Sequence, residues 1–305
     1  METFEIHILG CGSALPTMRH LPASQIVLLR NKLFMIDCGE GAQRQMRRSR
    51  LSFSRLNHIF ISHLHGDHCF GLPGLISTFS LLGRTAPLHI YAPQKLEELM
   101  LPWLHYFCHG ISFSPVFHPI TPENGFSVIY EDRSVTVYSF PLNHRIPCCG
   151  FLFREKATLP HIRRDMIDFL NIPVCEINNI KNGADWTTPD GKFFANNRLV
   201  YPADPPRSYA YCSDTAPLPE NAEILQGIDL LFHESTFAES EILRAAQTFH
   251  STARQAAEFA RQARVKQLLI GHYSSRYNDE STLLDEARNI FPNTLAAKEN
   301  MKIVL

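Results

Sequence analysis

Short hydrophobic runs, each bounded by glycine or polar residues, make up most of the first half of the chain. Compact apolar runs of this length are typical of buried strands, whereas apolar positions that recur every three to four residues are typical of helices. The predicted strands are Phe4–Leu9, Gln25–Leu29, Leu33–Asp37, His58–Ser62, Leu88–Tyr91 and Ser134–Phe140. The predicted helices are Leu72–Leu82 and Gln94–Tyr106.

The same alternation of strands and helices returns in the last third of the chain. The predicted strands there are Ser208–Ser213, Asp229–His233, Gln267–Gly271 and Met301–Val304, and the predicted helices are Glu239–Thr248, Thr252–Arg264 and Ser281–Ile290. Thr252 is followed three residues later by Gln255, which is a capping-box pattern for the start of a helix. Two similar halves of this kind predict an α/β fold with two sheets and helices on the outside.

Residues 154–206 do not share this pattern. They carry scattered charges and many proline, asparagine and glycine residues, and the one helix predicted there is Arg163–Leu170. Long irregular stretches inside a compact protein are more often functional or mobile than packed. We therefore predict one domain, residues 1–305, in which 154–206 is an inserted excursion from the core and not a second globular domain.

Composition places the chain among ordinary globular proteins. Of its 305 residues 45% are hydrophobic and 19% are charged, and the net charge of −1 does not indicate a broadly basic surface. The N-terminus lacks a basic stretch followed by an apolar segment, and no apolar run reaches the roughly 18 residues that a membrane span needs. The eight cysteines form no Cys-x-x-Cys pair. These features predict a reduced, cytoplasmic protein without a membrane segment.

The hexapeptide His63-Leu64-His65-Gly66-Asp67-His68 is the strongest chemical signal in the chain. It places three imidazoles and one carboxylate just after an apolar run, and zinc takes nitrogen and oxygen ligands of these kinds. The glycine permits a tight turn that would aim the last two ligands differently from the first two. A single histidine near a strand end is usually incidental, but four candidate ligands in six residues predict a metal site.

Four further positions lie at or just beyond the carboxyl ends of predicted strands, where sites in layered α/β proteins gather. They are His144, Asp214, His272 and the pair His233-Glu234. A carboxylate such as Asp214 can bridge two metal ions about 3.5–4 Å apart, which together activate a water molecule for hydrolysis.

These residues resemble the metallo-β-lactamase superfamily and, within it, the ribonuclease Z family of endonucleases that process tRNA 3′ ends. The hexapeptide matches the superfamily's His-x-His-x-Asp-His motif. Matches to the narrower family are Phe34–Gly41, Gly71–Leu75, Ser213-Asp214-Thr215, His233–Phe237, His250-Ser251-Thr252 and the stretch from Ala287 through Pro292-Asn293. The resemblance covers essentially the whole chain except the insertion.

The resemblance implies a four-layer αββα sandwich with an inserted flexible arm, residues 154–206. It implies two zinc ions per subunit. One ion would be held by His63, His65 and His144, and the other by Asp67, His68 and His272. Asp214 would bridge the two ions.

The resemblance also implies the catalytic groups, the substrate and the assembly. Asp67 would accept a proton from the attacking water, and His250 would assist the leaving 3′ oxygen with Glu234 orienting it. The reaction would remove 3′ trailers from precursor tRNA and leave a 3′-hydroxyl on the tRNA and a 5′-phosphate on the trailer. The arm would bind tRNA in a homodimer. Asp37 and Glu40 are predicted to tie a loop to the site.

The chain departs from the family pattern in two places. The arm tip commonly carries closely spaced lysines, but here only Lys181 is basic. The loop after the first strand, 16–21, lacks the family's Pro-x-Lys-x-Arg-Asn sequence, so the cleavage position relative to CCA stays open. A separate basic run places Arg44, Arg47 and Arg48 at helical spacing. Such a face either contacts RNA or is simply solvated.

Two other functions remain open at this stage. The first is a small-molecule zinc hydrolase of phosphodiesters or sulfate esters, which would use every one of these ligands. The second is a metal-poor RNA-binding scaffold, although the complete ligand set argues against it. The residue types do not distinguish zinc from manganese or iron.

Overall fold

The structure is a computed structural model that describes residues 2–15, 17–108 and 110–305, so Pro16 of the divergent loop lies outside the described residues. The described chain divides into two compact units. Residues 2–154 and 207–305 form the main unit, and residues 155–206 form the inserted unit. Within the described residues, no helix is both long enough and apolar enough to cross a membrane.

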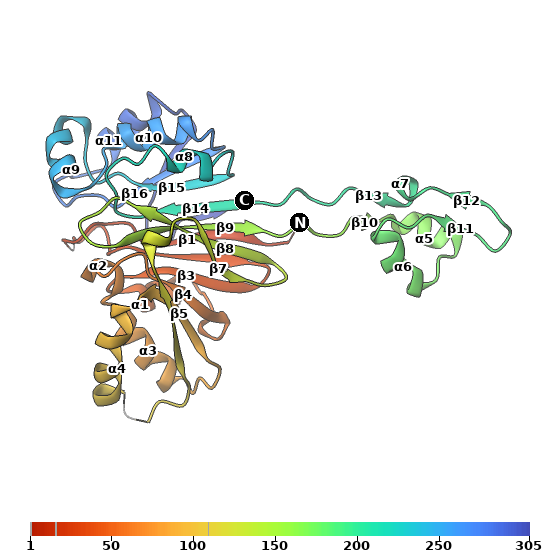
Figure 1. Ribbon diagram of the computed structural model, residues 1–305, viewed down its shortest axis with the longest axis horizontal. Helices are drawn as coiled ribbons and strands as arrows, with labels where there is room; N and C mark the ends of the chain where they lie inside the picture. The colour runs from red at the N-terminus through yellow and green to blue at the C-terminus, as the bar shows by residue number, and fades with distance from the viewer. Residues whose placement is uncertain (1, 16, 109) are drawn as a thin grey trace. The chain divides into compact units, whose positions relative to one another are not determined.

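Two seven-stranded sheets form the centre of the main unit (Figure 1). The first sheet has the order β18 (Lys302–Val304), β1 (Phe4–Gly10), β2 (Ser24–Leu29), β3 (Lys32–Cys38), β4 (Leu56–Phe60), β5 (Leu88–Pro93) and β6 (Pro115–Ile120). The second has the order β17 (Thr294–Ala296), β16 (Gln267–Gly271), β15 (Leu230–Glu234), β14 (Ser208–Cys212), β9 (Cys148–Glu155), β8 (Val135–Leu142) and β7 (Ser127–Glu131).

Aromatic side chains join the two sheets face to face. The Phe153 ring centroid of the second sheet lies 5.8 Å from that of Phe34 and 5.6 Å from that of Phe60 in the first sheet. All three rings are fully buried, and burying such a side chain stabilises the fold by roughly 1.5–3 kcal/mol. The dry layer between the sheets therefore holds the strand ends of both sheets in fixed positions.

Helices cover both outer faces, so the predicted αββα arrangement is confirmed. The helices associated with the first sheet are α1 (Ala42–Arg48), α2 (Gly66–Cys69), α3 (Leu72–Leu81) and α4 (Lys95–Phe107). Those associated with the second sheet are α8 (Asn221–Ile224), α9 (Ile242–Thr248), α10 (Ala253–Gln262) and α11 (Ser281–Arg288). Three 3₁₀ turns among the described residues are η1 (Phe53–Arg55), η2 (Pro122–Asn124) and η3 (Glu239–Glu241).

Most predicted elements of the main unit are present, with ends that differ by one or two residues. The predicted capping box is confirmed, because Gln255 and Thr252 satisfy each other's backbone N–H groups at the start of α10. The sequence predicted further short strands around Ser134–Phe140 but gave no bounds for β9, whose residues are nearly all buried and therefore do not alternate between apolar and polar. It also missed α1, which is short and rich in arginine.

The inserted unit has a small core of its own, which the sequence pattern did not indicate. Its elements are β10 (His161–Ile162), α5 (Arg164–Leu170), α6 (Val174–Lys181), β11 (Trp186–Thr187), β12 (Phe193–Phe194), α7 (Asn196–Leu199) and β13 (Val200–Tyr201). Leu170, Ile172, Ile180 and Leu199 are buried together. Because each element is short and contributes one or two of these side chains, no period is visible in the sequence.

Candidate metal centre

The candidate ligands leave the ends of five strands or follow them closely. The hexapeptide lies three residues past the end of β4, and His144 lies two residues past β8. Asp214 and His272 follow β14 and β16, while Glu234 is the last residue of β15. Because the two sheets pack face to face, these loops converge. The candidate side chains thus lie at or just beyond the carboxyl ends of strands.

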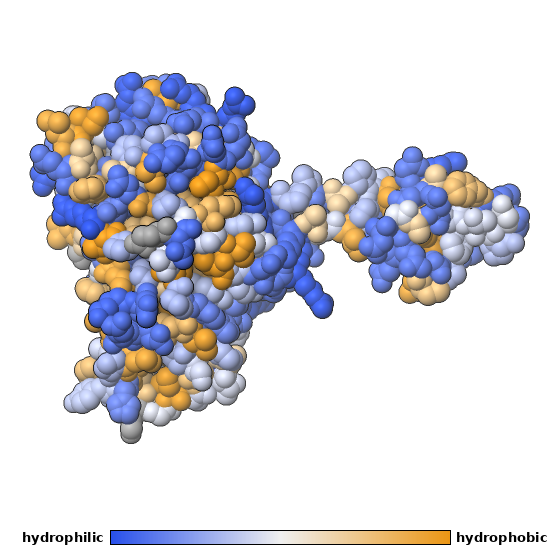
Figure 2. All heavy atoms as spheres, viewed as in Figure 1, coloured by the Kyte–Doolittle hydropathy of each residue, from blue (hydrophilic) through white to orange (hydrophobic). Residues whose placement is uncertain are grey.

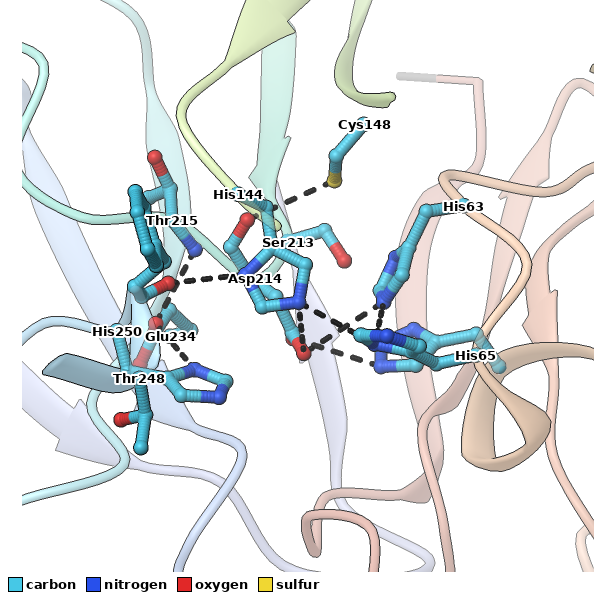
Figure 3. A network of polar contacts seen from close by, with 12 residues as sticks. His63, His65, His144, Cys148, Ser213, Asp214, Thr215, Glu234, Thr248 and His250 are labelled. Atoms are coloured by element: carbon cyan, nitrogen blue, oxygen red, sulfur yellow. Dashed lines mark hydrogen bonds and ion pairs between the residues drawn. The ribbon is translucent and has the colours of Figure 1, made fainter. Parts of the chain in front are cut away.

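Three histidines surround one oxygen of Asp214 (Figure 3). His65 Nδ1 lies 3.1 Å from His63 Nε2 and 3.2 Å from His144 Nε2. Asp214 Oδ2 lies 3.6 Å from His63 Nε2 and 3.8 Å from His144 Nε2. Four ligand atoms this close together, on side chains that are mostly buried, have the spacing of a single metal position.

The other oxygen of Asp214 belongs to a second group with Asp67, His68 and His272. Asp214 Oδ1 lies 3.4 Å from His68 Nε2 and 3.1 Å from His272 Nε2. Asp67 Oδ2 lies 3.4 Å from the same two nitrogens. The structure therefore brings together all seven predicted ligands, and Asp214 is the residue common to both groups.

Unpaired polar atoms show that this donor set fits a cation. His68 Nε2 and Asp214 Oδ1 are buried and have no hydrogen-bond partner among the described residues. An unpaired buried polar atom costs about 1–3 kcal/mol, so natural structures rarely keep two of them side by side. A divalent metal bound between them would satisfy both. Imidazole nitrogens with carboxylate oxygens are the ligands of catalytic zinc sites.

Four of the five candidate histidine ligands are held so that Nε2 faces the centre, whereas His65 faces it with Nδ1. Their Nδ1 atoms lie against fixed oxygens: 2.7 Å from Asp37 Oδ2 for His68, 3.0 Å from Ser62 Oγ for His63, 2.9 Å from Thr236 Oγ1 for His272 and 2.9 Å from the Phe249 carbonyl for His144. Such partners fix the tautomer and the orientation of a metal-binding imidazole. Asp37 thus ties its loop to the site as predicted, whereas Glu40 is exposed.

Three non-glycine residues around the centre have left-handed backbones. The φ angles are +53° at Asp37, +57° at Phe249 and +63° at His272. Such conformations cost roughly 1–3 kcal/mol and persist only where the surroundings impose them. Each of the three residues contributes an atom to the ligand shell or to its support. The unfavourable backbone conformations therefore direct these groups toward the centre at a cost in stability.

Gly66 has a different role from the one that the sequence indicated. It is not among the described glycines with positive φ, so the turn does not depend on glycine's conformational freedom. Instead, a Cβ at this position would lie 2.3 Å from the Phe70 ring. Close packing against Phe70 is therefore the reason for glycine here. The predicted division of the ligands into two groups does agree with the geometry.

A second cluster joins His250 to the centre through Glu234. The buried Glu234 carboxylate lies 2.9 Å from His250 Nδ1 and accepts hydrogen bonds from the backbone N–H groups of Ser251 and Thr236. Burial disfavours a charged imidazole, but the adjacent Glu234 carboxylate raises the pKa of His250 to about 9. The contact with Glu234 therefore favours the protonated form of His250.

Burial and charge act in opposite directions on the ligands themselves. Burial holds the pKa of His63 well below its usual value and keeps the ring in the neutral form that binds metals. Burial alone would raise the pKa of Asp214, but the imidazoles of His272 and His68 hold that pKa well below its usual value. The carboxylate is therefore ionised, as a bridging ligand must be.

An open pocket of about 470 Å³ gives access to these groups. Three arginines, Arg145, Arg244 and Arg276, line it together with His65, Asp67, His144, Asp214, His250 and His272. Sequence reasoning missed the arginines and Thr236, whose hydroxyl contacts Glu234, His250 and His272. Only the position of Arg145 next to His144 gave any signal. Positive charge beside a metal centre suits an anionic substrate.

Comparisons with known proteins cover the whole chain. Residues 4–160 match the family model described as Anti-Pycsar protein Apyc1, and residues 199–273 match the model described as a beta-lactamase superfamily domain. In three dimensions the chain is similar to the short form of human tRNase Z, with a TM-score of 0.73 and 26% identity over 98% of each chain.

Two bacterial relatives are much more similar in sequence. A Ribonuclease Z from Bacteroides fragilis strain YCH46 is 65% identical over 100% of both chains. A Ribonuclease Z from Phocaeicola vulgatus is 64% identical over 99% of this chain and 98% of its own. The matched length includes the insertion as well as the strand-end candidate ligands. The chain therefore belongs to the ribonuclease Z family, which has the metallo-β-lactamase fold, and is an endoribonuclease of the hydrolase class.

Proposed function

We propose that this protein is a zinc-dependent endoribonuclease that removes 3′ trailers from precursor tRNA with two metal ions. The observation that carries the proposal is the sharing of Asp214 between two ligand groups, beside the Glu234–His250 pair and within one pocket. The names of the relatives supply the substrate class, because both are called Ribonuclease Z.

The proposed cofactor is two zinc ions per subunit. His63, His65 and His144 would hold one, Asp67, His68 and His272 would hold the other, and Asp214 would bridge them. When bound, the ions supply positive charge that stabilises the phosphoryl oxygens and lowers the pKa of the attacking water.

The protein's own groups orient that water and take up its proton. Asp67 Oδ2 lies at the wall of the pocket and, although burial opposes its charge, the neighbouring His68 holds the Asp67 pKa below its usual value. An ionised carboxylate at this place accepts a hydrogen bond from the water and then its proton. General acid–base help of this kind is worth roughly 10²–10⁴-fold in rate.

His250 acts on the opposite side of the phosphodiester in this proposal. Its Nδ1 is fixed by Glu234, so its Nε2 is left to donate a proton to the departing 3′ oxygen. The scission would then leave a 3′-hydroxyl on the tRNA and a 5′-phosphate on the trailer. Glu234 is a positioning residue, because it acts through His250.

The inserted unit, residues 154–206 in the sequence-based prediction, is the proposed exosite for tRNA. Several of its basic side chains are already paired, as Arg163 is with Asp165 at 2.8 Å and Lys192 with Asp190 at 3.1 Å. Its exposed aromatic side chains include Phe169 and Phe193. Because nucleobases stack on aromatic rings, this unit would bind with a weaker salt dependence than a lysine-rich tip.

We also propose a homodimer through α3 and α4. Leu81, Leu82, Leu99, Tyr106 and Phe107 are all more than half exposed there, and Figure 2 shows hydrophobic atoms in this lower part of the main unit. Exposed apolar clusters of this kind mark interaction sites. The cytoplasm is the proposed compartment, because all eight cysteines are free and seven are buried.

Cleavage of a precursor tRNA with a 3′ trailer tests this function, with products mapped to the nucleotide. The wild-type protein should cut near the discriminator base, Asp67→Ala should abolish the cut and His250→Ala should slow it about 10²–10⁴-fold. The mapped ends would also settle the position relative to CCA. Turnover of a small phosphodiester without any cut in the precursor would support the small-molecule hydrolase and overturn the proposal.

A further inference from the structure

A second pocket of about 550 Å³ lies on the main unit between the loop 17–21 and helix α1. Thr17, Met18, Arg19, His20 and Leu21 form its loop side. The other side consists of Gly41, Arg44, Gln45 and Arg48 from the start and body of α1, with Glu299 between them. No metal ligand of the catalytic centre lines this pocket, and the proposed mechanism does not use it.

Two arginines in this pocket have no partner. Arg44 and Arg48 are exposed, and among the described residues no carboxylate lies within ion-pair distance of either guanidinium. They are one helical turn apart, so both side chains leave α1 on the same face. Arg47 differs, because its guanidinium lies over the Phe53 ring, 5.5 Å from the centroid. Arg44 and Arg48 line this pocket, and Arg44 also lines a smaller hollow with Arg47 and Phe53.

A partly buried ion-pair cluster holds the loop side of the pocket. His20 Nδ1 lies 3.0 Å from Glu299 Oε2, and His20 Nε2 lies 2.7 Å from Glu280 Oε1. Glu299 also accepts a hydrogen bond from the Leu21 backbone N–H at 2.8 Å. Among the described contacts, Glu299 forms no ion pair with Arg44 or Arg48, and the pocket lining holds three arginines against this one carboxylate. The pocket therefore presents net positive charge on a rigid frame.

A third hollow of about 220 Å³ shares lining residues with both pockets. This hollow shares Ser274 and Ser275 with the catalytic pocket, and it shares residues 17–20 with the arginine pocket. Residues 13–15, which precede the loop, also line the catalytic pocket. The loop 17–21 thus borders the arginine pocket, and its neighbouring residues border the catalytic pocket.

We propose that Arg44 and Arg48 bind phosphates of the substrate RNA at a subsite away from the scissile bond. The inference rests on the proposed function for the identity of the RNA. Guanidinium groups pair with phosphate in a bidentate way, and each such contact releases counterions and makes binding dependent on salt. The subsite fixes the position of the strand and leaves the chemistry to the metal centre.

The test compares the zinc-loaded wild type with Arg44→Gln/Arg48→Gln and with Arg55→Gln. Arg55 is exposed, carries the same charge and lines none of the three pockets. Single-turnover cleavage of precursor tRNA at increasing enzyme concentration gives the half-saturating concentration and the maximal rate. Each measurement is repeated at several salt concentrations. Hydrolysis of bis(p-nitrophenyl) phosphate reports on the centre alone.

The double variant should raise the half-saturating concentration about tenfold and make the logarithmic salt slope smaller by about 2, one unit per lost contact. Its maximal rate and its hydrolysis of the small ester should stay within twofold of wild type. An unchanged slope, equal to that of Arg55→Gln, would overturn the proposal. If wild type leaves the precursor uncut, the proposed function fails instead, and the dissociation constants of the intact RNA then test the subsite separately.

Discussion

The metal centre and the inserted unit are built with very different degrees of support. At the centre His63 and His68 are fully buried. Each has its Nδ1 within hydrogen-bond distance of a fixed oxygen, Ser62 Oγ for His63 and Asp37 Oδ2 for His68. The inserted unit has a core of four buried side chains and ion pairs that are exposed to solvent. Exposed pairs contribute only about 0–1 kcal/mol, so this unit has a much smaller margin of stability.

This difference agrees with hydrolysis in the main unit and substrate binding in the inserted unit. Hydrolysis requires ligands fixed within fractions of an ångström, and a large two-sheet core supplies that rigidity. Substrate binding tolerates a unit that unfolds locally more easily, because the binding energy is divided among many weak contacts. The account therefore expects changes at the centre to affect the chemical step, and changes in the inserted unit to affect mainly the binding of long RNA.

The largest effect is expected from Asp214→Ala. Both metal positions lose a ligand, so the rate of precursor cleavage should fall roughly 10⁴-fold or more, which is about 5–6 kcal/mol of transition-state stabilisation. Metal analysis should find fewer than two ions per chain. Asp285→Ala, at an exposed position of α11, is the control and should retain both metals and rate. Two bound ions and normal cleavage in Asp214→Ala would contradict the bridging role.

Removing the inserted unit should separate binding from chemistry. Arg154 of β9 pairs with Ser208 of β14, so the chain leaves and re-enters the main unit at neighbouring antiparallel positions. A short Gly-Ser turn in place of residues 156–205 can therefore close a hairpin. KM for precursor tRNA should rise about 10²-fold because one of two linked binding regions is lost. Hydrolysis of bis(p-nitrophenyl) phosphate should change less than twofold. An unchanged KM would show that the inserted unit is not a binding site for tRNA.

Asp37→Asn tests the support behind one ligand. The change weakens the acceptor at His68 Nδ1, and loss of such a partner typically lowers metal affinity 10–100-fold. Competition with a zinc-chelating dye measures the affinity of the weaker position. Tyr211→Phe is the matched comparison, since it removes a 2.8 Å hydrogen bond to the same carboxylate and leaves its contact with His68. If Asp37→Asn binds both ions as wild type does, the positioning role is wrong.

The smallest effect on RNA cleavage is expected from Leu199→Ala. Leu199 is fully buried in the core of the inserted unit, and such a truncation costs about 2–5 kcal/mol. Hydrogen exchange should accelerate within residues 155–206 while β14 and β15 keep their protection. KM for tRNA should rise by less than in the deletion. Equal loss of protection in both units would show that they unfold together and would contradict the lower stability of the inserted unit.

The sequence predicted the centre better than its surroundings for a physical reason. The ligands in residues 63–68 are contiguous, and Asp214 and His272 directly follow strands whose burial is visible as apolar runs. Thr236 and Arg145 gave no comparable signal, because their roles depend on which loops meet in space. The core around Leu170 and Ile180 was missed because short elements with one buried residue each have no period. Gly66 was predicted to permit a tight turn, but its φ is not positive, and a Cβ at this position would instead collide with the Phe70 ring.

A zinc titration of the metal-free protein tests the central claim, that both metal positions serve one reaction. The precursor-cleavage rate is followed against zinc equivalents per chain, with bound metal counted at each point. The account predicts that cleavage stays low up to the first equivalent and reaches its full rate at the second, because Asp214 joins both positions around one substrate phosphate. Full activity with a single bound ion would contradict the two-metal account.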